Sequence, residues 1–150
     1  EGGAARRVAE RVRAGECDLS ILDRICEQYT QAVARKGPGN TAAKRYRSLT
    51  RLNKLFHDSV LELSGCSRLQ DLMRTQWPLF DRLTLRFALL PEAERLVQEH
   101  RGIVEVMRAG MAEEAEAKMR EHIVRAGEAV VRYWGGESGG TGGKGVVATR

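Results

Sequence analysis

The chain has 150 residues, of which 42% are hydrophobic and 30% charged, with a formal net charge of +5. This composition is typical of one folded domain with a real core, and it excludes a chain that is disordered throughout. No apolar run approaches the roughly 20 residues that cross a bilayer, and no signal-peptide pattern opens the chain, so no membrane partner is expected. The cysteines, Cys17, Cys26 and Cys66, form no CxxC pair, which favours a reducing, cytoplasmic location.

Basic and acidic residues alternate along nearly every segment with helical periodicity. Such mixing is typical of a solvated helix face, whereas a nucleic-acid binder concentrates lysine and arginine in a stripe or patch. Direct binding of nucleic acid by this part of the protein is therefore not expected.

Six segments show apolar residues at spacings of three and four, the period of a helix with one buried face. Residues that start or stop helices separate them: Asp18, Thr41 and Ser67 as caps, Pro91 in a first turn, and Gly15, Gly37, Gly65 and Gly110 as stops. The predicted helices are 4–14, 18–36, 41–64, 67–87, 91–109 and 111–134.

The fourth segment contains Pro78, which predicts a kink or a break near Trp77. No segment alternates with period two, so no sheet is expected. The short turn near Gly110 predicts that the last two helices run antiparallel. The predicted fold is all-α, an antiparallel bundle of about six helices over residues 1–134, followed by a flexible, Gly-rich tail over residues 135–150.

The histidines of the chain, His57, His100 and His122, each fall on the apolar face of a predicted helix. Asn53 precedes His57 by four residues and shares its face. His100 and His122 lie at a similar distance from the turn near Gly110, so both should sit at the same height of a helical hairpin. Imidazoles that converge with an oxygen ligand are typical of a divalent first-row metal site, although a lone histidine on an apolar face is more often a buried core residue.

These residues also resemble a known family. Phe56-His57, the stretch Glu99 to Val104, the Ala109-Gly110 turn and the stretch Met119 to Ile123 closely resemble the FCD domain, the effector-binding domain of FadR-type GntR transcriptional regulators. The start of the chain, residues 4–11, is similar to the first helix of that domain. The resemblance spans residues 1 to 133, and the histidines are its most specific part.

The resemblance implies a helical bundle that binds a small organic acid, often over a divalent metal, here zinc or nickel. It implies a homodimer and an N-terminal winged helix-turn-helix domain, absent from this chain, that binds operator DNA. The implied metal ligands are Asn53, His57, His100 and His122. The first position is typically aspartate in the family, so the neutral Asn53 should weaken metal binding and leave charge for an anionic effector to supply.

Polar residues of the predicted fourth helix are candidate effector contacts. Gln76 and Thr84 interrupt its apolar stripe, and Arg82 is a candidate for binding a carboxylate, although a solvated arginine is the commoner case. The leading hypothesis is an effector-sensing domain that is not an enzyme. The alternatives are a small metal-dependent hydrolase or lyase, which would need a general base near the ion, and a structural interaction bundle with buried histidines.

Overall fold

The structure is a computed structural model that describes residues 1–35, 37, 41–84 and 89–137. Within these ranges, the side chains of residues 42, 79–84, 89–92, 130 and 133–137 lie outside the description. The described residues form six α-helices and no strand, which confirms the all-α prediction. The helices are α1 (Gly2–Arg13), α2 (Ser20–Ala34), α3 (Ala42–Leu63), α4 (Ser67–Thr84), α5 (Leu89–Arg108) and α6 (Ala112–Glu137).

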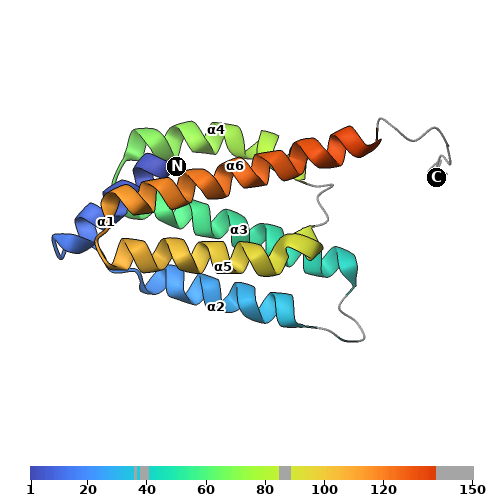
Figure 1. Cartoon of the computed structure of the whole chain (residues 1–150), viewed down its shortest axis with the longest axis horizontal. Helices are drawn as coiled ribbons and strands as arrows, with labels where there is room; N and C mark the ends of the chain where they lie inside the picture. Colours follow the sequence, from blue (N-terminus) through green and yellow to red (C-terminus); the bar gives the residue numbers. More distant parts are fainter. Residues whose placement is uncertain (36, 38–40, 85–88, 138–150) are drawn as a thin grey trace.

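The helices form a bundle in which successive elements from α2 to α6 run in alternating directions (Figure 1). Helix α3 packs against α2, α4 and α5, and α5 packs against both α2 and α6. Helix α1 lies across one end of the bundle and contacts α3, α5 and α6. The first residues of the chain are therefore brought to the middle of the bundle, next to segments that follow them by more than 50 residues.

Glycines end three of the helices, as the sequence predicts. Gly15, Gly65 and Gly110 all have positive φ, the left-handed conformation that glycine adopts at least cost. At Gly110 the backbone N–H groups of Gly110 and Met111 donate to the carbonyls of Met107 and Val106, the Schellman pattern of a helix C-terminus. This tight turn sends α6 back along α5, which confirms the predicted hairpin.

One predicted cap is wrong and another is confirmed. Helix α2 begins one residue later than expected, with Leu19 in the cap position, and the Asp18 carboxylate accepts hydrogen bonds from the backbone N–H and hydroxyl of Ser20. Thr41 caps α3 as predicted, since its hydroxyl oxygen accepts from the N–H of Lys44 at 3.3 Å. An aspartate can accept from a free N–H of the first turn either as the cap residue or as the residue before the cap. The residue type alone therefore does not tell at which residue α2 begins.

Helix α4 continues through Pro78 without a break. Leu69 and Met73, which helical spacing places on the same face as Gln76, pack against the core, but Trp77 is buried in place of Gln76, and Leu72 is exposed. Gln76 and Trp77 are neighbours and lie three and four residues after Met73, so the sequence pattern supports either; packing of α4 on α3 selects Trp77.

The core consists of two clusters of buried apolar side chains. The larger joins α1, α2, α3, α5 and α6 at the end of the bundle that α1 covers, and the smaller joins α2, α3 and α5 toward the other end. Tyr29, Phe56 and Met107 are among the largest side chains without exposed surface. The histidines lie where these apolar side chains meet, so any chemistry there takes place away from bulk water.

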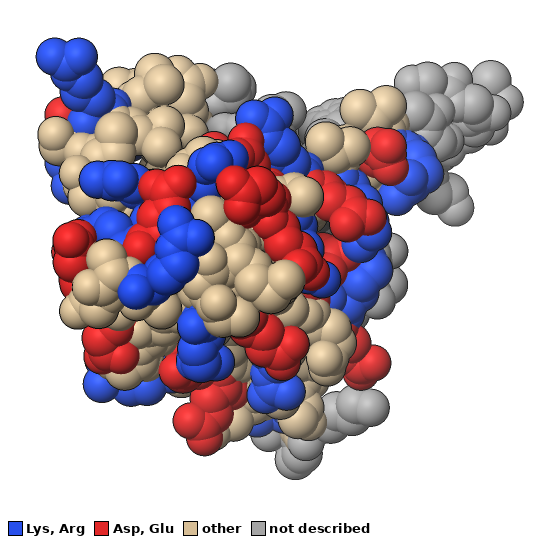
Figure 2. All heavy atoms as spheres, turned by 60° about the vertical axis from the view of Figure 1, so that its left-hand side comes forward, with Lys and Arg blue, Asp and Glu red and all other residues tan. Residues whose placement is uncertain are grey.

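Acidic and basic side chains alternate over the face of the molecule in Figure 2. This mixing agrees with the expectation of solvated helix faces on that side. Among the described helices, none is long and apolar enough to cross a membrane. Helix α6 ends at Glu137, three residues beyond its predicted end at residue 134, and residues 138–150 lie outside the described residues.

Candidate metal centre

Three helices bring the three histidines together. His57 comes from α3, His100 from α5 and His122 from α6, and all three are at most 3% exposed. Each offers a ring nitrogen within 4.8 Å of the other two. The Nε2 atom of His122 lies 3.2 Å from Nε2 of His100 and 3.4 Å from Nε2 of His57. The predicted convergence of the histidines is thus present in the fold.

Aromatic packing holds the His100 ring in place. Phe56 stacks on His100 with ring centroids 3.9 Å apart and planes at 11°, and Tyr29 stacks at 5.7 Å. Phe56 precedes His57 in α3, so one helical turn supplies both a ligand candidate and the wall that orients another. The rings of His57 and His122 stack at 5.3 Å. Packed rings of this kind have few rotamers, and the nitrogens are therefore positioned before any ligand binds.

Two carboxylates bind the outer nitrogens of the cluster. The Nδ1 atom of His57 lies 2.5 Å from Oε2 of Glu1, and the Nδ1 atom of His122 lies 2.7 Å from Oε2 of Glu99. Neither contact was predicted. On its own helix Glu99 points about 100° away from His100, but its partner is His122 on the neighbouring helix. Glu99 lies 11 residues before Gly110 and His122 lies 12 residues after it, so the hairpin spacing in the sequence could have indicated this pair.

The two carboxylates determine which nitrogens of His57 and His122 carry protons. Burial would raise the pKa of Glu1, but the charge and hydrogen bond of His57 outweigh it and lower that pKa. The pKa of Glu99 is lowered in the same way by His122 and Arg125 against the effect of burial. Both carboxylates are therefore ionised near neutral pH and can only accept hydrogen bonds, so His57 and His122 must donate through Nδ1–H.

Two of the histidines, His100 and His122, favour the neutral form. Burial and the neighbouring imidazoles lower the pKa of His100 well below its ordinary value. Burial, with the charge of His57, lowers the pKa of His122 to about 4 even though Glu99 acts in the opposite direction. Neutral imidazole with a proton on Nδ1 has a bare lone pair on Nε2, which is the form that binds metals.

The arrangement fits a divalent transition metal. With Nδ1 protonated, the Nε2 atoms of His57 and His122 face each other at 3.4 Å with two lone pairs and no hydrogen to share. An ion about 2.0–2.1 Å from each nitrogen in tetrahedral geometry holds its ligands about 3.3 Å apart, which is close to the observed separations. Three neutral imidazoles suit zinc, nickel or another late divalent ion.

Of the remaining predicted site residues, the structure describes the side chains of two and not those of the other two. Asn53 is half-buried, one turn before His57 on α3. The expected burial of Gln76 is wrong: its side chain is exposed and its amide donates to Thr75, so any effector role stays a prediction. The side chains of Arg82 and Thr84 lie outside the described residues.

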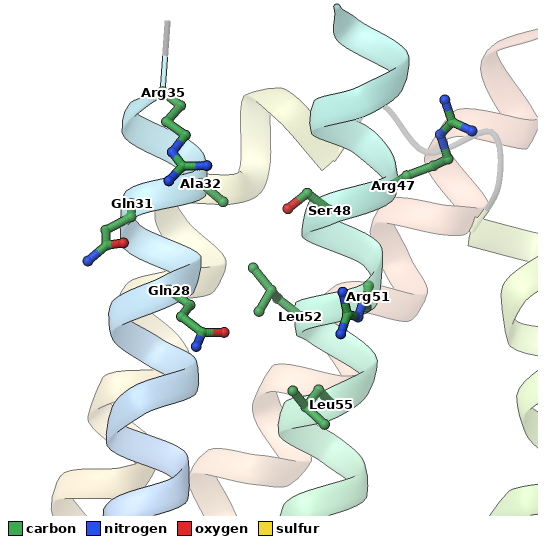
Figure 3. A pocket seen from close by; sticks show the side chains of 9 residues that line it. All are labelled: Gln28, Gln31, Ala32, Arg35, Arg47, Ser48, Arg51, Leu52 and Leu55. Carbon is green, nitrogen blue, oxygen red and sulfur yellow. The ribbon is translucent and has the colours of Figure 1, made fainter. Parts of the chain in front are cut away.

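A separate groove of about 430 Å³ lies between α2 and α3 (Figure 3). On α3 it is lined by Ser48, Arg51, Leu52 and Leu55, and in Figure 3 the Ser48 and Leu52 side chains extend from α3 toward α2. At 100° per residue this face is roughly opposite that of His57. The groove is therefore not an entrance to the histidine centre.

Comparison with known proteins identifies the family. Searches of curated proteins and of solved structures gave no match. Residues 1–125 match the FCD domain, the effector-binding regulatory domain of GntR-type transcription factors. The match covers most of the chain and includes Glu1, Glu99 and all three histidines, and it confirms the resemblance that the histidine motifs indicate. The chain belongs to the FCD domain family.

Proposed function

We propose that this chain is the ligand-sensing domain of a FadR-type GntR regulator. It binds zinc or nickel through His57, His100 and His122, with the Asn53 carbonyl as an oxygen ligand. A small carboxylate effector binds at the ion, and its binding changes the operator affinity of an N-terminal winged helix-turn-helix domain in a homodimer. Operator binding implies a cytoplasmic protein.

The observation that carries this proposal is the set of inward-facing Nε2 lone pairs. Two hydrogen-bonded carboxylates orient these nitrogens, and neutral imidazoles so close together gain nothing from one another without a proton or a cation between them. When bound, a divalent ion supplies a positive centre to which a carboxylate oxygen can coordinate. The packed rings of Phe56 and Tyr29 shield that centre from water and so strengthen its attraction for an anion.

The same contacts favour a sensor over a metalloenzyme. An enzyme that uses metal-bound water needs a general base beside that water. Both carboxylates that contact the described histidines, Glu1 and Glu99, instead accept hydrogen bonds from Nδ1–H groups on the outer side of the rings. Arg82 and Thr84 on α4 are the proposed effector contacts, because a guanidinium and a hydroxyl can together bind a carboxylate.

Metal binding tests the centre. Protein freed of metal with a chelator is titrated with Zn²⁺ and with Ni²⁺ in a calorimeter, and one ion per chain is expected. Alanine at His57, His100 or His122 should strongly weaken binding, and Asn53→Asp should strengthen it by adding a charged oxygen. Cys66→Ser is the matched control, since the exposed Cys66 thiol is a second kind of zinc ligand. Absence of binding, or unchanged binding in all three histidine variants, would contradict the proposal.

Effector binding tests the function. A panel of small organic acids is added to metal-loaded and to metal-free protein, and the melting temperature is recorded. An acid present at about 100 times its Kd should stabilise the loaded protein by about 2.7 kcal/mol and the metal-free protein much less. Conversion of any acid to product during the incubation would favour the enzyme alternative instead.

A further inference from the structure

A divalent ion at this centre would carry two positive charges that its proposed ligands do not neutralise. Three neutral imidazoles and the amide of Asn53 contribute none, so a divalent ion held by them alone would bury two positive charges. Such burial is costly unless opposite charges lie close by. Glu1 and Glu99 lie one imidazole ring away from the Nε2 atoms, and their side chains are only 11% and 12% exposed.

We propose that Glu1 and Glu99 are positioning residues of the metal centre and supply the negative charge that Asn53 lacks. Each holds one histidine, His57 or His122, with Nδ1 outward and Nε2 inward. Their carboxylates place negative charge directly behind the two rings that would hold a divalent ion. The inference rests on the proposed metal binding, and it assigns roles to two residues that do not themselves contact the ion.

The two carboxylates contribute differently. Oε1 of Glu99 also accepts from Arg95 at 2.5 Å and from Arg125 at 3.0 Å, so its charge is already shared with two cations. The carboxylate of Glu1 faces His57 from the N-cap position of α1, where the Glu1 backbone carbonyl accepts hydrogen bonds from the N–H groups of Ala4 and Ala5. Glu1 therefore contributes mainly charge, and Glu99 contributes mainly orientation.

Glutamine and alanine separate these contributions. Glutamine keeps an oxygen that accepts from Nδ1–H but removes the charge, whereas alanine removes both. Loss of a carboxylate behind a metal-bound histidine typically costs about 10–100-fold in affinity. We expect a loss in this range for Glu1→Ala, Glu99→Ala and Glu1→Gln, and a smaller loss for Glu99→Gln. Glu121→Gln is the matched control, since Glu121 is exposed and pairs with Arg125 without contacting a histidine.

The test combines calorimetric titration with Zn²⁺ and long-range ¹H–¹⁵N spectra of the imidazole rings, whose few signals can be assigned by single substitutions. In the metal-free wild type, His57 and His122 should both show the Nδ1–H form. Glu1→Ala should change the signals of His57, and Glu99→Ala those of His122. The glutamine variants should keep the wild-type signals and, because they are close in shape to glutamate, should stay folded if an alanine variant does not.

The outcomes distinguish this inference from the proposed function. If the wild type binds no Zn²⁺, the proposed metal centre itself is wrong. If the wild type binds Zn²⁺ and the Glu1 and Glu99 variants bind it equally tightly, the centre stands and the positioning role is overturned. A changed ring signal without loss of affinity also overturns it, as does an equal loss in Glu121→Gln.

Discussion

Acid should destabilise the metal-free protein well before its carboxylates titrate. In the unfolded chain His122 has an ordinary pKa of 6.5, whereas in the fold burial lowers its pKa to about 4. Between these values the unfolded state binds a proton that the folded state does not, so the free energy of unfolding decreases as the pH falls. The pKa of His100 is lowered in the same direction by burial and by its neighbouring histidines.

The size of the effect follows from the pKa difference. Each pH unit over which the unfolded state holds one more proton costs about 1.4 kcal/mol, so His122 alone accounts for on the order of 3 kcal/mol between pH 6.5 and 4. This stability is fully present above pH 6.5. Glu1 and Glu99, whose pKa values are lowered in the fold, add a further loss only at lower pH, below the pKa of an ordinary glutamate.

Urea denaturation followed by circular dichroism at intervals from pH 7.5 to 4.5 measures this slope. The metal-free wild type should lose stability steadily below pH 6.5, and His122→Gln, which removes one titrating group, should lose it less steeply. Saturating Zn²⁺ should oppose the loss while metal and proton compete for the same nitrogens. Constant stability from pH 7 to pH 5, or a rise, would refute the buried and neutral state of His100 and His122.

Three further predictions concern the surroundings of the centre. Phe56→Ala should cost about 3–5 kcal/mol of unfolding free energy in urea, because it removes a fully buried ring and the stacking partner of His100; a cost below about 1 kcal/mol would contradict the packing. Gly110→Ala should lower stability by about 1–2 kcal/mol in thermal melts, since its φ of 69° strains a residue with a Cβ atom; an unchanged melting temperature would argue against the turn. With a thiol reagent at pH 8, exposed Cys66 should react first, and Cys26, whose pKa is raised to about 11 by burial, should react only on unfolding; equal rates would be inconsistent with the fold.

Local signals in the sequence account for the fold. Apolar residues at helical spacing and glycines with a left-handed backbone are properties of a few neighbouring residues, and they predict the helices and most of their ends. Apart from helix ends that differ by two or three residues, the errors are shifts by one position, at Asp18 before α2 and at Gln76 on α4. Each arises where two neighbouring choices satisfy the local rules equally, so that packing against another helix decides between them.

The candidate site was predictable only in part, because it is built between helices. The turn at Gly110 can be recognised from the sequence, and it places His100 and His122 at a similar height of the hairpin. His57 joins them through the packing of α3 on α5, which spacing alone does not give. The contact of Glu1 with His57 joins residues 56 positions apart, and it depends on where α1 crosses the end of the bundle.

The negative charge near a buried metal centre is not limited to the charges of the residues that bind the ion. From the sequence, replacement of aspartate by Asn53 leaves a divalent ion without a counter-charge and makes an anionic effector the natural source of one. In the fold, the carboxylates of Glu1 and Glu99 already lie behind His57 and His122, although Glu99 shares its charge with Arg95 and Arg125. If the charge of Glu1 opposes much of the ion's charge, an arriving carboxylate is needed less for neutrality. Its recognition then depends on groups that bind the carboxylate directly rather than on excess charge at the metal. The affinity measurements on Glu1→Gln separate these two accounts, because the loss of one charge should weaken metal binding in the absence of any effector.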